Sequence, residues 1–204
     1  MTKEQFEQVN RILASAEQEA EEHGIRLKRV KFDNKMNPAE VETLFKVSLM
    51  RFLSPTMQYL PEYDKVISWM KENSGKSLIL MGKCGLGKSI IACKVIPTLL
   101  ATKGIFVHPA NAKEFAKVGV VKDRSFWIVD DIGTEGIVKD FGTEVDKISE
   151  LLDRIDMIGG TAVITTNLTA EQLKERYGER NYDRMKQNFE IVSINHESMR
   201  GLKQ

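Results

Sequence analysis

From residue 61 onward, short apolar runs alternate with stretches in which apolar residues recur every three or four positions. The apolar runs predict buried strands at 77–81, 104–108, 126–129, 161–167 and 189–194, and the recurring patterns predict helices that include 88–101 and 143–158. Strands that alternate with helices in this way form a parallel sheet covered on both faces. The chain is therefore predicted to have an α/β fold with right-handed crossovers.

The first part of the chain shows helical patterns only. Phe6, Val9 and Leu13 begin a thin apolar stripe, which could pack on other helices or bind a partner. A second helix is expected to start at Asn37-Pro38. Its predicted inner face consists of Val41, Leu44, Phe45, Ser48, Leu49 and Phe52. Because prolines then interrupt the pattern, we predict a helical partner-binding region at 1–53, a linker at 54–60 and the main domain at 61–204.

Composition narrows the class of protein without pointing to a partner. Of 204 residues, 42% are hydrophobic, and 30 basic against 29 acidic side chains leave a net charge of +1. No apolar run approaches the roughly 20 residues of a membrane span, and the polar N-terminus does not look like a signal peptide. A disulfide between Cys84 and Cys93 would distort the glycine-rich loop in which Cys84 lies, so we expect reduced thiols and a cytoplasmic location.

A glycine-rich stretch joins the first predicted strand to the following helix. Gly82 and Gly87-Lys88-Ser89 have the spacing G-x-x-x-x-G-K-S of a phosphate-binding loop. Glycines allow consecutive backbone N–H groups to face a triphosphate, Lys88 can reach the β- and γ-phosphates, and Ser89 can offer its hydroxyl to Mg²⁺. The predicted nucleotide-binding residues are Gly82, Lys83, Cys84, Gly85, Leu86, Gly87, Lys88, Ser89 and Ile90.

Two aspartates end the predicted strand at 126–129. Asp130 follows four apolar residues, as in a Walker B strand, and would hold Mg²⁺ directly or through water, opposite Ser89. Asp131 stands where a carboxylate can orient the attacking water. Glutamate is the usual and longer residue there, so we predict slow hydrolysis. Glu135 is a further carboxylate nearby, for which the sequence indicates no role.

An asparagine and a pair of arginines are further candidates. Asn167 could bond the γ-phosphate or the attacking water, or it could cap a helix that begins near Thr169. Arg180 and Arg184 are four residues apart and share one face if their segment is helical. Taken alone, they are interpreted as ordinary surface arginines.

Taken together, these motifs resemble the DnaC/IstB branch of the AAA+ ATPases, and in particular bacterial and phage helicase loaders of the DnaC and DnaI kind. The resemblance covers about residues 61–204. Many NTPases share the phosphate loop; the more specific motifs are Tyr177-Gly178-Glu179-Arg180, Asp183-Arg184-Met185 and Glu197-Ser198-Met199-Arg200. The resemblance implies a P-loop AAA+ domain, which is a three-layer parallel sheet with helices on both faces, and a truncated C-terminal lid.

The resemblance also implies roles for single residues. Asn167 would be sensor I, and Arg200 would be a sensor II-like arginine. Arg184, with Arg180 as the second choice, would be an arginine finger that enters the ATP site of a neighbouring subunit. Because few residues follow Arg184, we expect that a neighbour completes the site. The implied cofactors are ATP and Mg²⁺. The implied partners are a DnaB-type replicative hexameric helicase, single-stranded DNA and further copies of the chain in a head-to-tail spiral or hexamer.

The resulting functional prediction is an ATP-dependent helicase loader in DNA replication, with ATP binding and slow hydrolysis as its switch. An IstB-type transposition helper has the same core, and the sequence does not separate the two. A P-loop small-molecule kinase is a second alternative, although no arginine-rich lid follows the third strand. A module that binds ATP without hydrolysing it is a third. Residues 1–53 contain no cysteine, so they depart from the zinc-binding N-terminal domain of the DnaI type.

Overall fold

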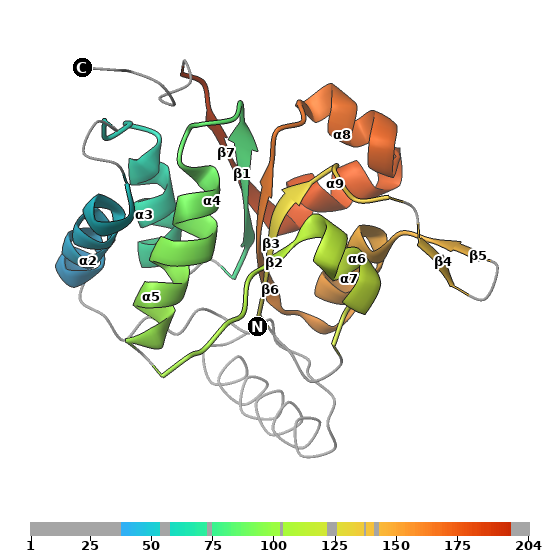
Figure 1. Cartoon of the computed structure of the whole chain (residues 1–204), viewed down its shortest axis with the longest axis horizontal. Helices are drawn as coiled ribbons and strands as arrows, with labels where there is room; N and C mark the ends of the chain where they lie inside the picture. The colour runs from blue at the N-terminus through green and yellow to red at the C-terminus, as the bar shows by residue number, and fades with distance from the viewer. Residues whose placement is uncertain are drawn as a thin grey trace, which may run out of the picture.

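The computed structural model describes residues 38–53, 58–72, 75–102, 104–121, 126–136, 138–140 and 143–196. The predicted first helix, most of the linker and Arg200 lie outside these ranges. The elements shown in Figure 1 are α2 (Pro38–Phe52), α3 (Tyr63–Glu72), β1 (Ser77–Gly82), α4 (Lys88–Ile90), the π-helical turn η1 (Ile91–Val95), α5 (Ile96–Ala101), β2 (Ala110–Asn111), α6 (Ala112–Val118), β3 (Phe126–Ile132), β4 (Val138–Asp140), β5 (Thr143–Val145), α7 (Lys147–Ile158), β6 (Thr161–Thr166), α8 (Ala170–Tyr177), α9 (Glu179–Asn188) and β7 (Phe189–Ile194).

Five strands form one parallel sheet in the order β2-β3-β6-β1-β7. Helices α2 to α5 cover one face of this sheet and α6 to α9 cover the other (Figure 1). The predicted three-layer α/β fold is therefore confirmed. Strand β6 comes late in the chain but lies between β1 and β3, so the segments that follow these strands meet at one edge of the sheet.

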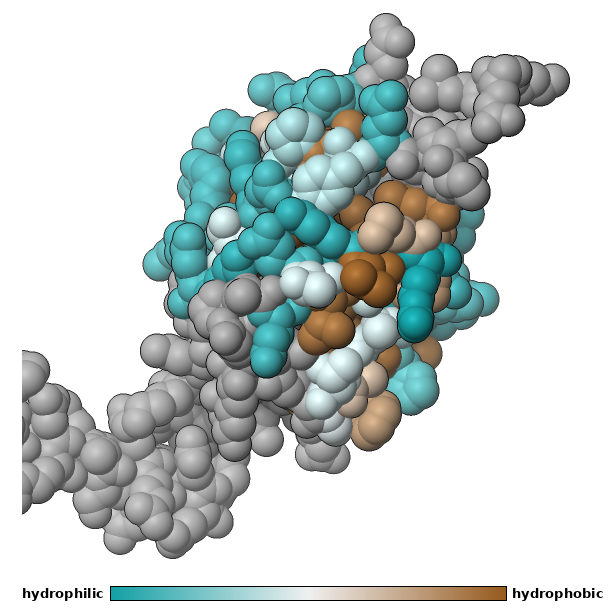
Figure 2. Space-filling model, turned by 90° about the vertical axis from the view of Figure 1, so that its left-hand side faces the viewer, coloured by the Kyte–Doolittle hydropathy of each residue, from teal (hydrophilic) through white to brown (hydrophobic). Residues whose placement is uncertain are grey.

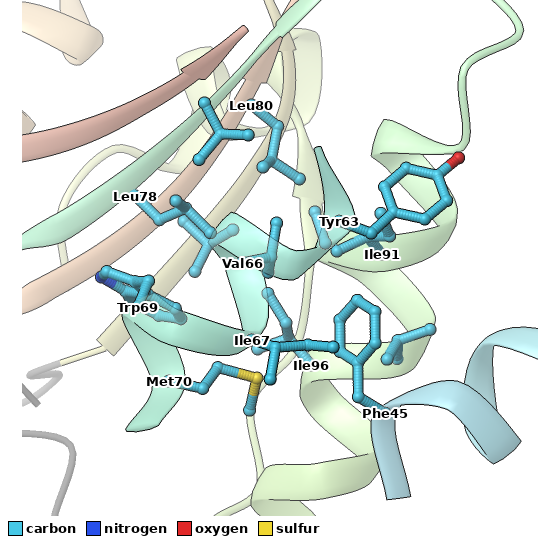
Figure 3. Packing of buried hydrophobic residues seen from close by; sticks show 14 of the residues in the cluster. Phe45, Tyr63, Val66, Ile67, Trp69, Met70, Leu78, Leu80, Ile91 and Ile96 are labelled. Carbon is cyan, nitrogen blue, oxygen red and sulfur yellow. The ribbon is translucent and has the colours of Figure 1, made fainter. Parts of the chain in front are cut away.

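Side chains of β1 alternate between the two faces of the sheet, as the strand period requires. Leu78 and Leu80 belong to the core under α2 and α3, whereas Ile79 belongs to the core under α6 to α9. Figure 3 shows the first of these cores, in which Leu78 and Leu80 of β1 lie beside Val66 of α3. Two separate apolar layers thus hold β1 in place just before the phosphate loop.

Helix α2 packs into the same core as α3, β1 and α5, although it precedes the predicted linker. Val41, Phe45 and Leu49 are buried in the cluster that contains α3 and the helix after the phosphate loop. Phe52, which was expected inside, is 39% exposed, and Met50 is 71% exposed. Figure 2 looks onto this side of the molecule and shows apolar groups among polar ones on its surface.

The strand predicted at 104–108 is wrong. The strand on this side of the sheet is the two-residue β2, in which Ala110 pairs with Val129 of β3. Phe106 of the predicted strand is 79% exposed. An apolar run becomes a strand only where it can exchange backbone hydrogen bonds with a neighbouring strand. Here β3 provides such a partner at 110–111 and not at 104–108.

The helix predicted from residue 143 begins instead at Lys147. The carboxylate of Asp146 accepts the N–H of Ile148 at 3.0 Å and so caps the first turn. Residues 143–145 form β5, which pairs antiparallel with β4 in a separate hairpin. Figure 1 shows this hairpin extending away from the sheet.

The helix predicted over 88–101 is confirmed as one helical run with an irregular centre. In η1 the N–H of Ile96 donates to the carbonyl of Ile91, which is the wider π spacing. Pro97 follows directly and has no N–H to give to the preceding turn. In the described part of the chain, none of the helices has the length and apolar character needed to cross a bilayer.

Candidate nucleotide-binding site

The loop between β1 and α4 has a backbone path that requires glycine. Gly82 has a φ of 149°, and a Cβ there would lie 2.3 Å from the carbonyl oxygen of Ile194. Gly87 has a φ of 73° and directly precedes Lys88. The buried hydroxyl of Tyr63, on α3, donates to the carbonyl of Leu86 at 3.1 Å. The loop is therefore fixed by β7 on one side and by α3 on the other.

A cavity of about 320 Å³ opens between this loop and the ends of β3 and β6. It is lined by Cys84, Gly85, Leu86, Gly87, Lys88, Ser89, Ile90, Asp130, Asp131, Thr165 and Asn167. The structure thus brings together most of the residues predicted for the nucleotide, for Mg²⁺ and for hydrolysis. The predicted residues among the described ones that do not line it include Arg180 and Arg184.

A chain of hydrogen bonds links three of the residues that line the cavity. The ammonium of Lys88, a residue only 6% exposed, donates to the carbonyl of Lys83 at 2.8 Å and to Oδ1 of Asn167 at 2.9 Å. The amide of Asn167 then donates to Oδ1 of Asp131 at 2.6 Å. A buried cation, an amide and a carboxylate are therefore linked, from the phosphate loop to the residue expected to orient water.

The cap of α8 is Thr169, not Asn167. The hydroxyl of Thr169 accepts the N–H of Gln172, and the Gln172 side chain accepts the N–H of Thr169 in return. Of the two interpretations of Asn167 that the sequence left open, the structure thus excludes the helix cap. The Asn167 side chain lies in the cavity.

Asp130 and Asp131 lie in a β-bulge at the end of β3. Val129 pairs with Ile164 and Ile132 pairs with Thr166, so both aspartates lie opposite Thr165 alone. Asp131 has a φ of 62°, the one positive value among the described residues other than glycine. Strained backbone of this kind concentrates at functional sites.

The environment of Asp131 disfavours its charge. Burial raises the pKa of Asp131, the charge of Asp130 raises it further, and Lys88 partly offsets both effects. The structure therefore holds a carboxylate that takes up a proton more readily than an exposed aspartate, in the position expected for the group that orients water.

The oxygen donors on the cavity wall fit Mg²⁺. Ser89, which is exposed, and Asp130, which is half-buried, both line the cavity, and Asp130 accepts a hydrogen bond from Thr165. Magnesium takes few protein ligands and completes its shell with phosphate oxygens and water, so a hydroxyl and a carboxylate suffice.

Burial raises the pKa of Cys93 in η1 to about 12, with Asp130 the second cause, so this thiol stays protonated.

Glu135 has a structural position that the sequence did not indicate. Its carboxylate accepts the N–H of Gly133 at 2.7 Å, pairs with Arg176 at 3.1 Å and accepts the hydroxyl of Tyr177. It thus ties the segment after Asp131 to α8. Burial, followed by the hydrogen bond to Glu135, raises the pKa of Tyr177.

The two candidate arginine fingers differ in their surroundings. The Arg184 side chain is 17% exposed and pairs with Asp153 and, at 3.6 Å, with Asp156 on α7. Arg180, one turn earlier on α9, is exposed, and no described residue holds its side chain by a hydrogen bond or ion pair. Helix α9 thus carries one arginine bound within the chain and one facing solvent. The roles of both remain predictions.

Solved structures with the same fold include a helicase loader. The crystal structure of the DnaC helicase loader is 17% identical, with a TM-score of 0.51 over 75% of this chain and 99% of that chain. The crystal structure of DnaI is 16% identical, with a TM-score of 0.53 over 75% of this chain and 93% of that chain. DnaA from Aquifex aeolicus, solved with bound AMPPCP, is 16% identical, with a TM-score of 0.51 over 73% of this chain and 53% of that chain.

These likenesses confirm the predicted AAA+ fold of the DnaC and DnaI type. A search among curated proteins found no match. A family model described as novel STAND NTPase 3 matches residues 60–201, which include the phosphate loop, both aspartates and Asn167. The match spans more than half of the chain and the whole of the cavity lining, so the chain belongs to the novel STAND NTPase 3 family.

Proposed function

We propose that the chain binds ATP with Mg²⁺ in the cavity beside the phosphate loop and hydrolyses it slowly. The observation that carries this proposal is the hydrogen-bonded chain from Lys88 through Asn167 to Asp131. Lys88 binds phosphate, Asn167 responds to the γ-phosphate, and Asp131 orients the attacking water. The cation, held by Ser89 and Asp130, would neutralise phosphate charge. Hydrolysis is slow because the side chain of Asp131 reaches less far toward the attacking water than the glutamate that is usual at this position.

An arginine from a neighbouring copy completes this site. Arg184 is the first candidate by its motif, and it must leave Asp153 to reach a neighbour. Arg180 is already exposed and needs no such release. Arg200 is the remaining candidate, as a sensor II-like residue. Head-to-tail assembly of copies would bring such arginines to each nucleotide.

Mixing variants would identify the finger and show whether it acts between subunits. Lys88→Ala removes a copy's own site but leaves its arginines intact. Lys88→Ala would therefore be mixed with Arg180→Ala or with Arg184→Ala. Hydrolysis should return in the mixture whose second variant lacks the finger, because the Lys88→Ala copies supply the missing arginine. If neither mixture restores activity, the arginines do not act between subunits. If both single variants hydrolyse ATP at the wild-type rate, neither arginine is the finger.

The bound nucleotide is proposed to control the affinity of the chain for a DnaB-type hexameric helicase and for single-stranded DNA, as in a helicase loader of DNA replication. Support comes from the fold that the chain shares with the DnaC helicase loader. Residues 1–53 are proposed to hold the helicase and residues 61–204 the nucleotide.

A pull-down with the cognate hexameric helicase tests this function. The full chain, with ATP or ADP, should retain the helicase in amounts that depend on the nucleotide, and Lys88→Ala should not show this dependence. Retention of a transposase in place of the helicase would favour the transposition helper. Phosphoryl transfer to a nucleoside or metabolite would favour a kinase.

A further inference from the structure

We propose that Thr165 is the positioning residue for both aspartates of the nucleotide site, because its hydroxyl fastens the bulge that turns both carboxylates toward the cavity. This inference rests on the proposed ATP and Mg²⁺ site. Thr165 stands in the sequence close to Asn167 at the end of a buried strand, but the sequence alone indicates no role for it. Its importance follows from the register between β3 and β6.

In a regular strand, successive side chains point to opposite faces. Asp130 and Asp131 are successive, yet both line the same cavity. The bulge explains this, because it places two residues of β3 opposite Thr165 alone. Without the bulge, only one of the two carboxylates would face the nucleotide.

The hydroxyl of Thr165 makes two hydrogen bonds whose directions can be assigned. The N–H of Asp131 donates to Oγ1 of Thr165 at 2.8 Å, so the oxygen is an acceptor there. The single hydroxyl proton is then given to Oδ1 of Asp130, which is 2.6 Å away. Thr165 is 1% exposed, so its hydroxyl has little access to solvent.

These bonds have different consequences for the two aspartates. The first holds the Asp131 amide, which the bulge removes from the regular ladder, and so supports a φ of 62° that few residues adopt. The second stops the rotation of the Asp130 carboxylate and leaves its other oxygen for the cation. A group that orients a metal ligand in this way sets metal affinity without touching the metal.

The neighbouring threonine offers a matched control. Thr166 is equally buried, and its hydroxyl also makes two hydrogen bonds, to the carbonyl of Ile132 at 2.9 Å and from the N–H of Leu168 at 3.1 Å. Neither bond involves an aspartate. Thr165→Val and Thr166→Val therefore remove the same groups at the same depth, but only the first releases the aspartates.

Binding of a fluorescent ATP analogue, with Mg²⁺ or with EDTA, tests the proposal. Thr165→Val should weaken the Mg²⁺-dependent affinity about tenfold and leave the affinity in EDTA unchanged. Thr166→Val should change neither affinity, and Thr165→Ser should bind like the wild type. Circular dichroism at the assay temperature checks folding, and Thr165→Ala takes the place of the valine variant if that variant is unfolded.

Two results would overturn the inference in distinguishable ways. If Thr165→Val and Thr166→Val have the same Mg²⁺ dependence, Thr165 has no positioning role, while the magnesium site stands. If the wild type binds the analogue equally well with Mg²⁺ and with EDTA, the proposed magnesium site itself is wrong.

Discussion

Replacing Glu135 with alanine should destabilise the fold beside the nucleotide site. The Glu135 side chain is 4% exposed and links the segment after Asp131 to α8 through Gly133, Arg176 and Tyr177. Alanine would leave the buried hydroxyl of Tyr177 without its acceptor, at a cost of about 1–3 kcal/mol. The N–H of Gly133 is only half-buried, so its loss should cost about 1 kcal/mol.

Arg176 contributes less to this effect, because its side chain is 34% exposed and water can replace part of the ion pair. We therefore expect Glu135→Ala to lower the free energy of unfolding by about 3 kcal/mol. Glu135→Gln keeps an acceptor for Tyr177 and should cost about 1 kcal/mol. Urea unfolding followed by tryptophan fluorescence measures both values.

The control for this experiment is Glu175→Ala, which removes an exposed carboxylate from α8, the helix that Glu135 contacts, and should change stability by less than about 0.5 kcal/mol. A loss below about 1 kcal/mol for Glu135→Ala would refute the reasoning, since it would mean that Tyr177 finds another acceptor. Equal losses for the alanine and glutamine variants would show that charge, not hydrogen bonding, holds the segment.

Other predictions concern the site and the helices around it. Asp131→Asn should stabilise the fold by about 1 kcal/mol at neutral pH, because a raised pKa penalises the ionised form, and asparagine tolerates positive φ better. The gain should shrink as pH falls through the folded pKa, which thermal unfolding at several pH values would show. Lys88→Ala should abolish nucleotide binding, measured by calorimetry, and leave the circular dichroism spectrum unchanged; retained tight binding would contradict the loop assignment. Deleting residues 1–37 should leave a folded nucleotide domain that no longer captures the helicase, whereas deleting residues 1–53 also removes α2 from the core and should cause unfolding.

The sequence predicted those parts of the site whose signals are local. Glycine spacing, a lysine and a serine predict the loop from Gly82 to Ser89, since each has a role in known phosphate-binding loops that few other residues can fill. Asp130, Asp131 and Asn167 stand out because polar residues follow apolar runs at strand ends. The parallel sheet then brings them together, although they are distant in the sequence.

Features that depend on pairing between distant segments could not be predicted in this way. The bulge at Asp131 and the role of Thr165 follow from the register of β3 against β6, which no local pattern encodes. No role for Glu135 could be predicted because two of its partners, Arg176 and Tyr177, are about 40 residues away in the sequence. The apolar run at 104–108 looked like a strand because burial cannot be read from apolar residues alone.

The arrangement of Lys88, Asn167 and Asp131 explains why slow hydrolysis and switching belong together in the proposed function. Lys88 makes a hydrogen bond to Asn167, so a lysine that moves toward phosphate must change the environment of Asn167. Asn167 in turn donates to Asp131, so the direction of that carboxylate depends on what Lys88 binds. The bulge limits how far Asp131 can turn in response. Asp131 is thus a short carboxylate on a constrained backbone, and the amide of Asn167 couples it to the phosphate loop. This arrangement suits a site that reports nucleotide binding better than a site that hydrolyses ATP quickly.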